Sequence, residues 1–135
     1  MNLQSLQLAL CAFNFGAICF VQVVHYPLFA DIPEAVFNEY HRKHVHKTTL
    51  LLGITLTLEL FLNIFIFLQG TQTLRAALPI CFLILGWATT FLISVPQHQK
   101  LGTGFNQKAY RILLRSNAVR VLSWGGLTGC LLFTL

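Results

Sequence analysis

Four apolar stretches, each about as long as a membrane-spanning helix, constrain this chain more than any other feature of its sequence. They cover residues 3–24, 48–68, 76–95 and 113–135. A helix needs about 20 residues to cross the roughly 30 Å of hydrocarbon in a bilayer. Backbone polar groups in lipid must pair internally, which favours helices over an open sheet. We therefore predict an all-α, integral membrane four-helix bundle that forms a single domain over residues 1–135.

The composition supports the membrane class and argues against the others. Hydrophobic residues make up 56% of the chain and charged residues only 10%, whereas a soluble domain averages about 25% charged residues. A soluble fold of 135 residues needs more polar surface than this chain has. Disorder and nucleic-acid binding are excluded on the same grounds. The four cysteines lie in apolar runs and form no CxxC pair, so neither a disulfide framework nor a zinc knuckle is expected.

Local signals set the expected helix ends. The four helices should cover about residues 3–25, 34–68, 76–95 and 106–135. Asp31 and Pro33 resemble an N-cap followed by an early helical proline. Pro96 should end the third helix, and Gly102 and Gly104 should break the chain before the fourth. The first stretch has no Lys or Arg ahead of it and is longer than a signal-peptide core, so we expect it to be retained as a span.

Basic residues are unequally distributed between the two ends of the predicted bundle. Four spans place both long connections, residues 26–47 and 96–112, on one side and both termini on the other. Eight of the nine Lys and Arg residues fall on the long-connection side, and only Arg75 falls on the other. The eight are Arg42, Lys43, Lys47, Lys100, Lys108, Arg111, Arg115 and Arg120. The positive-inside rule then places the long connections in the cytoplasm and both termini outside a plasma or inner membrane.

All five histidines fall at the cytoplasmic end of the predicted bundle. His25 closes the first span, His41, His44 and His46 precede the second, and His98 follows the third. His41 and His44 share a helix face because they are three apart, whereas His46 lies about 140° round the helix from His41. Four-helix bundles build metal sites from inward side chains on facing helices. We therefore predict that His25, His41, His44 and His98 bind a divalent metal, with iron favoured and copper or zinc as alternatives.

Polar residues continue from the histidines toward the middle of the membrane. Asn14 lies 11 positions before His25 and Glu59 lies 11 positions after Thr48, which places both about 16 Å deep. Glu59 is the one acidic residue inside the four apolar stretches, where an ionisable group is expensive unless neutral or paired. Its expected partner is Asn14, with Arg120 as a second candidate. Glu59 would serve as a proton donor to a lipid-soluble substrate.

These positions define the candidate site. We assign Glu59, Asn117 and Arg120 as catalytic, Asn14 and Trp124 as cofactor-binding, and His25, His41, His44 and His98 as metal ligands. Asn117 and Arg120 would orient ligands or bind an anionic or quinone-like oxygen. The alternative for each residue is structural, as a solvated interfacial histidine, a buried hydrogen-bonding Glu59 or a polar turn with a phospholipid contact. No tight ligand motif such as HExxH is present.

The second half of the chain resembles a known family. Val95-Pro96-Gln97-His98 is followed, some twenty residues later, by Asn117-x-x-Arg120-x-x-x-Trp124, a pattern similar to that of the anthrone-oxygenase-like family of small four-helix membrane proteins. That family has a Val-Pro-x-Asn stretch and a late Asn-x-x-Arg. The resemblance implies oxidation of a lipophilic aromatic substrate. This chain has His98 where the family usually has Asn, and the additional histidines favour a metal-assisted version of the reaction.

The leading functional hypothesis is thus a membrane oxidoreductase or oxygenase acting on a lipophilic small molecule. Two alternatives stay open. The chain could be a non-catalytic subunit that binds or transports an ion, a proton or a lipid head group. It could also be a haem or quinone protein, with His25 and His98 as haem ligands.

Gly125, Gly126 and Gly129 form a small-residue face for close packing, within the bundle or in a homo-oligomer through Gly125 and Gly129.

Overall fold

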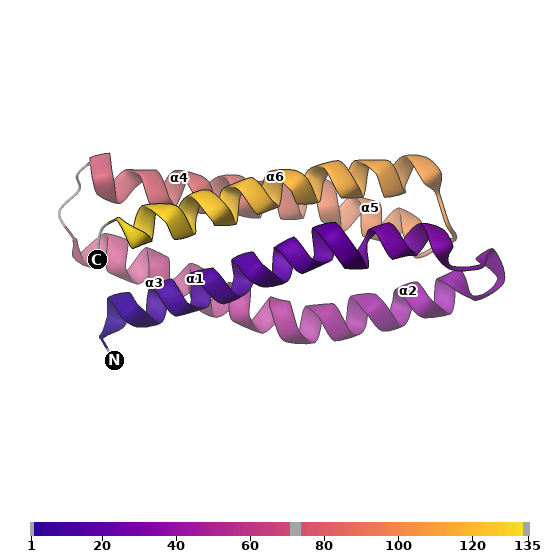
Figure 1. Ribbon diagram of the computed structural model, residues 1–135, viewed down its shortest axis with the longest axis horizontal. Coiled ribbons are helices and arrows are strands. Elements are labelled where there is room, and N and C mark those ends of the chain that lie inside the picture. Colours follow the sequence, from indigo (N-terminus) through magenta and orange to yellow (C-terminus); the bar gives the residue numbers. More distant parts are fainter. Residues whose placement is uncertain (1, 71–73, 134–135) are drawn as a thin grey trace.

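Four long helical rods run side by side in the computed structural model, which describes residues 2–70 and 74–133 (Figure 1). The elements in chain order are α1 (Leu3–Phe20), η1 (Val21–His25), η2 (Pro27–Asp31), α2 (Glu34–Thr48), η3 (Thr49–Gly53), α3 (Ile54–Gln69), α4 (Leu74–Thr89), η4 (Thr90–Ser94), α5 (Val95–Leu101) and α6 (Gln107–Leu132). The described ranges contain no strand, so the predicted all-α four-helix architecture is confirmed. The short connection expected at residues 69–75 and the end of the fourth helix at residue 135 lie partly outside the described residues.

The rods close into a ring of neighbours. α6 packs along both α4 and α1, while α3 packs on α1 and α4. The start of α1 and the end of α6 lie at one end of the bundle, and the α1–α2 and α5–α6 connections lie together at the other end (Figure 1). This arrangement brings the two long connections together, as the candidate site requires.

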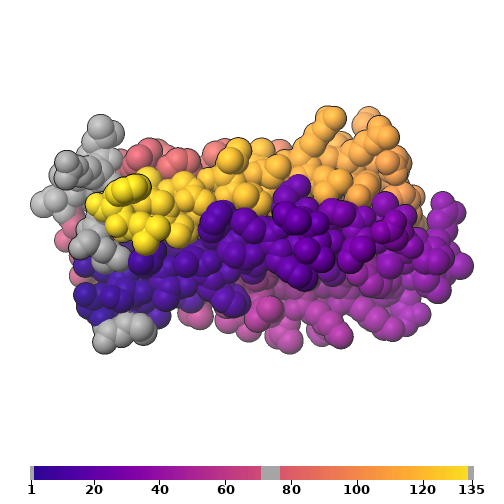
Figure 2. All heavy atoms as spheres, in the orientation of Figure 1, coloured from indigo at the N-terminus to yellow at the C-terminus, as the bar shows by residue number. Residues whose placement is uncertain are grey.

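The bundle is apolar outside and has many polar side chains among the hydrophobic residues of its interior. Large hydrophobic side chains such as Phe61, Leu68, Leu92 and Leu122 are more than three-fifths exposed, whereas many polar side chains are buried. Figure 2 shows one long face of the bundle, on which α1 lies in front. Among the described residues, three helical stretches are long and apolar enough to cross a membrane. They are Leu3–Asp31, Glu34–Gln69 and Ala77–Leu101. Such an outer surface suits contact with lipid.

Three of the rods contain a π-helical segment of five residues. A π turn is wider than an α turn, and such segments are frequent at functional sites. In η1 the backbone N–H of Tyr26 bonds to the carbonyl of Val21, five residues back, at 2.9 Å. His25 is the last residue of η1, His44 lies about one turn before η3, and His98 lies about one turn after η4. The widened turns therefore surround the histidine end of the bundle.

Two of the predicted helix ends are wrong. The helix does not end at Pro96 but continues through it to Leu101, with the proline in the first turn of α5. The π segment η4 ends at Ser94, two residues before the proline, and a wider turn at this point is suited to accommodate the proline ring. Asp31 is not an N-cap, because α2 begins at Glu34 after Pro33 and has no side-chain cap. The predicted break at Gly102 and Gly104 is present, and Asn106 caps α6 through a bond from the Ala109 N–H.

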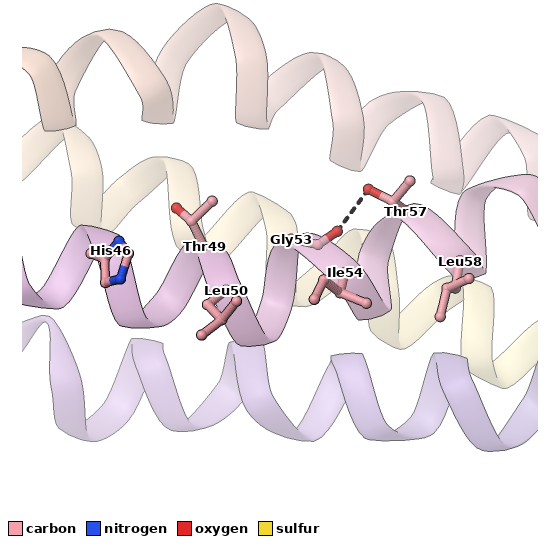
Figure 3. Close-up of a pocket in the computed structure, with 7 residues that line it drawn as sticks. All are labelled: His46, Thr49, Leu50, Gly53, Ile54, Thr57 and Leu58. Atoms are coloured by element: carbon pink, nitrogen blue, oxygen red, sulfur yellow. Dashed lines mark hydrogen bonds between the residues drawn. The ribbon is translucent and has the colours of Figure 1, made fainter.

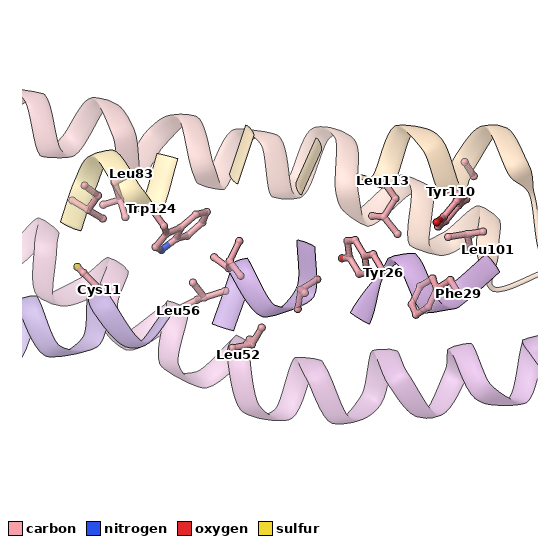
Figure 4. Packing of buried hydrophobic residues seen from close by; sticks show 14 of the residues in the cluster. Cys11, Tyr26, Phe29, Leu52, Leu56, Leu83, Leu101, Tyr110, Leu113 and Trp124 are labelled. Atoms are coloured by element: carbon pink, nitrogen blue, oxygen red, sulfur yellow. The ribbon is translucent and has the colours of Figure 1, made fainter. Parts of the chain in front are cut away.

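Trp124 is the largest fully buried side chain, and glycine makes room for it. Figure 4 shows it among the buried hydrophobic residues of the core. A Cβ built on Gly86 of α4 would clash with the Trp124 ring. In the same way, Gly125 accepts the ring of Phe15 and Gly126 that of Phe82. Two of the three glycines of the small-residue face are thus used for packing inside the bundle, while Gly129 has open space around it.

Substituting Gly86 tests this packing. We expect Gly86→Ala to lower the free energy of unfolding by about 1–3 kcal/mol, because the buried indole must shift to admit the methyl group. Gly16→Ala on α1 is the matched control, since a Cβ there meets nothing within 4 Å. The measurement is thermal unfolding in detergent micelles. Equal melting temperatures for wild type and Gly86→Ala would contradict the tight contact with Trp124.

Candidate functional site

Four imidazoles from three rods meet at one end of the bundle. His25 Nε2 lies 2.6 Å from His44 Nδ1, and His41 Nε2 lies 3.1 Å from His98 Nδ1. The ring centroids of His44 and His98 are 5.6 Å apart, which joins the two pairs into one cluster. His41 and His44 are buried, and His25 and His98 are half-buried. We call these four residues the histidine cluster.

Aromatic side chains form the surroundings of the histidine cluster. Phe29, which is fully buried in η2, has its ring edge-on to those of His25, His41 and His44 at centroid distances of 5.5, 5.9 and 5.0 Å. Phe37 stacks on His41 at 5.8 Å. The short helix η2 exists because Pro27 begins it directly after the first rod, which turns the chain back over the cluster. The imidazoles thus lie in a largely apolar pocket that restricts their contact with water.

Two hydroxyl groups fix the orientation of the cluster. The Tyr26 hydroxyl lies 2.8 Å from His98 Nε2, and Thr48 Oγ1 lies 3.1 Å from His44 Nδ1. In His98 the hydroxyl holds the second ring nitrogen and so orients the ring, as the supporting partners of metal-binding histidines do. Tyr26 therefore leaves the Nδ1 atom of His98 directed at His41. In His44, Thr48 contacts the same Nδ1 atom that faces His25.

The donor set suits a divalent metal, but the nitrogens are closer together than an ion would hold them. Neutral imidazole binds iron, copper and zinc, and nitrogens arranged tetrahedrally about one ion at roughly 2.1 Å lie about 3.4 Å apart. The two close pairs are at 2.6 and 3.1 Å. Accordingly, the part of the chain that the structure describes contains no group of three or more His, Cys, Asp or Glu residues already positioned to hold a metal ion. To bind one metal ion, the two nitrogens within each close pair would have to move slightly apart.

His46 does not join the cluster. Its side chain is exposed on the opposite side of α2, as its position on the helix predicts. It lines a groove of about 650 Å³ with residues of η3 and α3, among them Leu50, Ile54 and Leu58 (Figure 3). The groove is apolar and lies on the outer surface of one rod, so it is suited to contact with lipid.

Asn117 and Arg120 lie together just inside the histidine cluster. Arg120 Nη1 donates to Asn117 Oδ1 at 3.2 Å, and Asn117 Nδ2 donates to Gln22 Oε1 at 3.0 Å. The guanidinium also lies beside the Tyr26 hydroxyl and 5.6 Å from the centre of the Trp124 ring. Arg120 is 7% exposed, forms no ion pair within the described residues, and has no hydrogen-bond partner for its buried Nε. A buried cation without a carboxylate favours an anionic or strongly polar ligand oxygen.

Glu59 forms a second polar centre, deeper in the bundle. The Trp124 indole N–H donates to both of its carboxylate oxygens at 3.0 and 3.1 Å, and the Asn14 amide donates to Oε2. Thr55 in turn donates to Asn14 Oδ1 at 2.7 Å. The predicted pairing of Glu59 with Asn14 is confirmed, whereas Arg120 contacts Trp124 rather than the carboxylate. Asn14 and Trp124, predicted as cofactor-binding residues, both donate to Glu59, and the Oδ1 atom of Asn14 accepts from Thr55.

Some site residues were not predicted from the sequence. Tyr26 contacts His98, 72 positions later, and no spacing rule links the two residues. Gln97, which directly precedes His98 in the sequence, is buried, and its Oε1 has no hydrogen-bond partner. Gln7 extends the deep polar centre by donating to Asn63 Oδ1 at 2.8 Å. The helical stripe of polar residues could have indicated Gln7, since it lies seven positions before Asn14.

Comparison with known proteins adds no assignment to this geometry. No family model, no curated protein and no solved structure matches the chain.

Proposed function

We propose that this chain is a membrane-embedded, metal-dependent oxidoreductase that acts on a lipophilic substrate. The observation that carries the proposal is the convergence of His25, His41, His44 and His98 from three separate rods. Exposed histidines at a membrane surface would gain nothing from stacking on one another in an apolar pocket. Four neutral imidazoles suit a divalent ion, for which iron is our first choice and copper or zinc are alternatives.

Membrane insertion is the first part of the proposal. We infer that all four rods cross the bilayer, with the two long connections on the cytoplasmic side. The apolar outer surface and the three apolar stretches support insertion. Most basic residues lie at the histidine end, which supports the orientation. A substrate dissolved in the bilayer would then reach the polar interior between the rods.

The buried groups around the cluster support redox chemistry on a polar substrate oxygen. A metal held by the four histidines would supply electron transfer next to Arg120. Arg120 is placed to bind an oxygen that carries negative charge, because its guanidinium is buried beside the cluster without a carboxylate. Asn117 holds that guanidinium in place. The resemblance to the anthrone-oxygenase-like family in the second half of the chain agrees with an aromatic substrate.

Metal analysis of the purified protein tests this function. We expect about one equivalent of iron per chain after purification in detergent without chelators, and a change in its electron paramagnetic resonance signal on reduction with dithionite. Less than about a tenth of an equivalent of any transition metal, in protein whose fold is intact by circular dichroism, would reject the metal site. Zinc alone would reject the redox role, and a Soret band would show haem in its place.

A non-catalytic ion- or proton-binding function is the second candidate. It is favoured by the extent of the polar interior, which runs from Gln7 and Asn63 through Glu59 to Arg120 and the histidine cluster. Flux of protons or metal ions into liposomes that contain the protein, abolished in Glu59→Gln, would favour this candidate over catalysis.

A further inference from the structure

The outer face of the first half of α6 carries three basic side chains that have no acidic partner. Lys108, Arg111 and Arg115 are exposed and occupy successive turns of one helix face. Within the described residues, the one ion pair joins Lys43 and Glu39 on α2. The three side chains line a groove of about 540 Å³ together with Gln107 and Ile112. Long side chains at the start of α6 project from the surface in Figure 2. The groove therefore has an uncompensated positive charge.

The same face of α6 becomes apolar immediately below the basic residues. Val119 and Leu122 are 36% and 72% exposed, and they continue the line of Arg111 and Arg115 at helical spacing. Leu122 lies seven residues beyond Arg115, which corresponds to about 10 Å along the helix axis. A ligand that covers the whole face must have an anionic group at one end and a hydrocarbon chain at the other.

We propose that this face of α6 binds an anionic glycerophospholipid, with the headgroup phosphate on Lys108, Arg111 and Arg115 and an acyl chain along Val119 and Leu122. A guanidinium forms paired hydrogen bonds to phosphate oxygens, and two of the three cations are arginines. The apolar continuation selects a lipid over free phosphate. The groove lies on the outside of the bundle, so this inference does not depend on the function proposed for the interior.

Native mass spectrometry of the detergent-solubilised protein tests the lipid site. The probes are equimolar phosphatidylglycerol and phosphatidylcholine with the same acyl chains. Because the three cations attract an anionic headgroup, the wild type should retain phosphatidylglycerol with at least about 10-fold preference. The variant Lys108→Gln/Arg111→Gln/Arg115→Gln should lose that preference. These side chains are exposed, so its helix content and melting temperature should stay at the wild-type values.

The matched control is Arg42→Gln/Lys43→Gln/Lys47→Gln, which removes the same charge from exposed positions of α2 at the same end of the bundle. It should keep the preference for phosphatidylglycerol. Equal loss in both triple variants would overturn the site in favour of diffuse attraction, as would the absence of any preference in the wild type. Displacement of the lipid by millimolar inorganic phosphate would overturn it in favour of a small-anion site.

Discussion

Replacing His41 and His44 together by alanine is expected to remove essentially all bound metal. Both residues lie on α2, and each contacts a partner from another rod, His41 with His98 and His44 with His25. Losing half of the donor set should weaken binding by more than the roughly 10–100-fold that follows loss of a supporting residue alone. The metal content of the purified variant should therefore fall below about a tenth of an equivalent.

His46→Ala is the control for the loss of metal from the double variant. His46 lies two positions after His44 on the same helix, but its side chain is exposed on the outer surface. Its removal should leave metal content unchanged. Helix content by circular dichroism separates loss of ligands from loss of fold. Full metal occupancy in a folded double variant would show that α2 does not contribute ligands, and the cluster would then be a packing feature.

Replacing Glu59 by leucine is expected to destabilise the bundle strongly. The indole N–H of Trp124 and the amide of Asn14 both donate to the Glu59 carboxylate, and all three residues are buried. Leucine accepts no hydrogen bond, so two buried donors lose their acceptor. At about 1–3 kcal/mol for each unsatisfied group, the free energy of unfolding should fall by about 2–6 kcal/mol.

Two further variants make the Glu59 prediction specific. Glu59→Gln keeps a carbonyl oxygen for the Trp124 N–H and should therefore lose less stability than Glu59→Leu. Glu39→Gln makes the same chemical change on the surface of α2, where the ion pair with Lys43 is exposed, and should leave the melting temperature unchanged. Thermal unfolding in micelles measures all three variants. A Glu59→Leu protein as stable as the wild type would contradict the role of the carboxylate as the central acceptor.

The overall architecture could be predicted from the sequence because hydrophobicity and length determine it. Apolar stretches of about 20 residues specify helices in a membrane environment. Since consecutive spans cross the membrane in opposite directions, the sequence predicts His25, His41, His44 and His98 at one end of the bundle. The pairing of Glu59 with Asn14 was predictable for the same reason, since both lie at one depth and an isolated carboxylate at that depth is unfavourable.

The contacts within the site could not be predicted, because they depend on how each rod is rotated about its axis. The π segments change that rotation and leave no clear signature in the sequence. For this reason Pro96 was expected to end a helix that instead continues to Leu101. The bond between Tyr26 and His98 and the position of Trp124 between Arg120 and Glu59 likewise follow from side-chain packing. Spacing rules describe one helix at a time and do not report on such contacts.

The three π segments have a mechanical consequence for the histidine end of the bundle. A π turn can convert to an α turn by releasing one residue. Each of the three rods that carry the histidines can therefore change its local diameter at its π segment. An ion must spread nitrogen pairs that now lie 2.6 and 3.1 Å apart. We expect the three π segments to adjust on metal binding, while the close packing of Gly86 against Trp124 stays unchanged. Binding of a metal ion should then change amide hydrogen exchange at the histidine end of the bundle. Exchange in the region around Trp124 should stay unchanged.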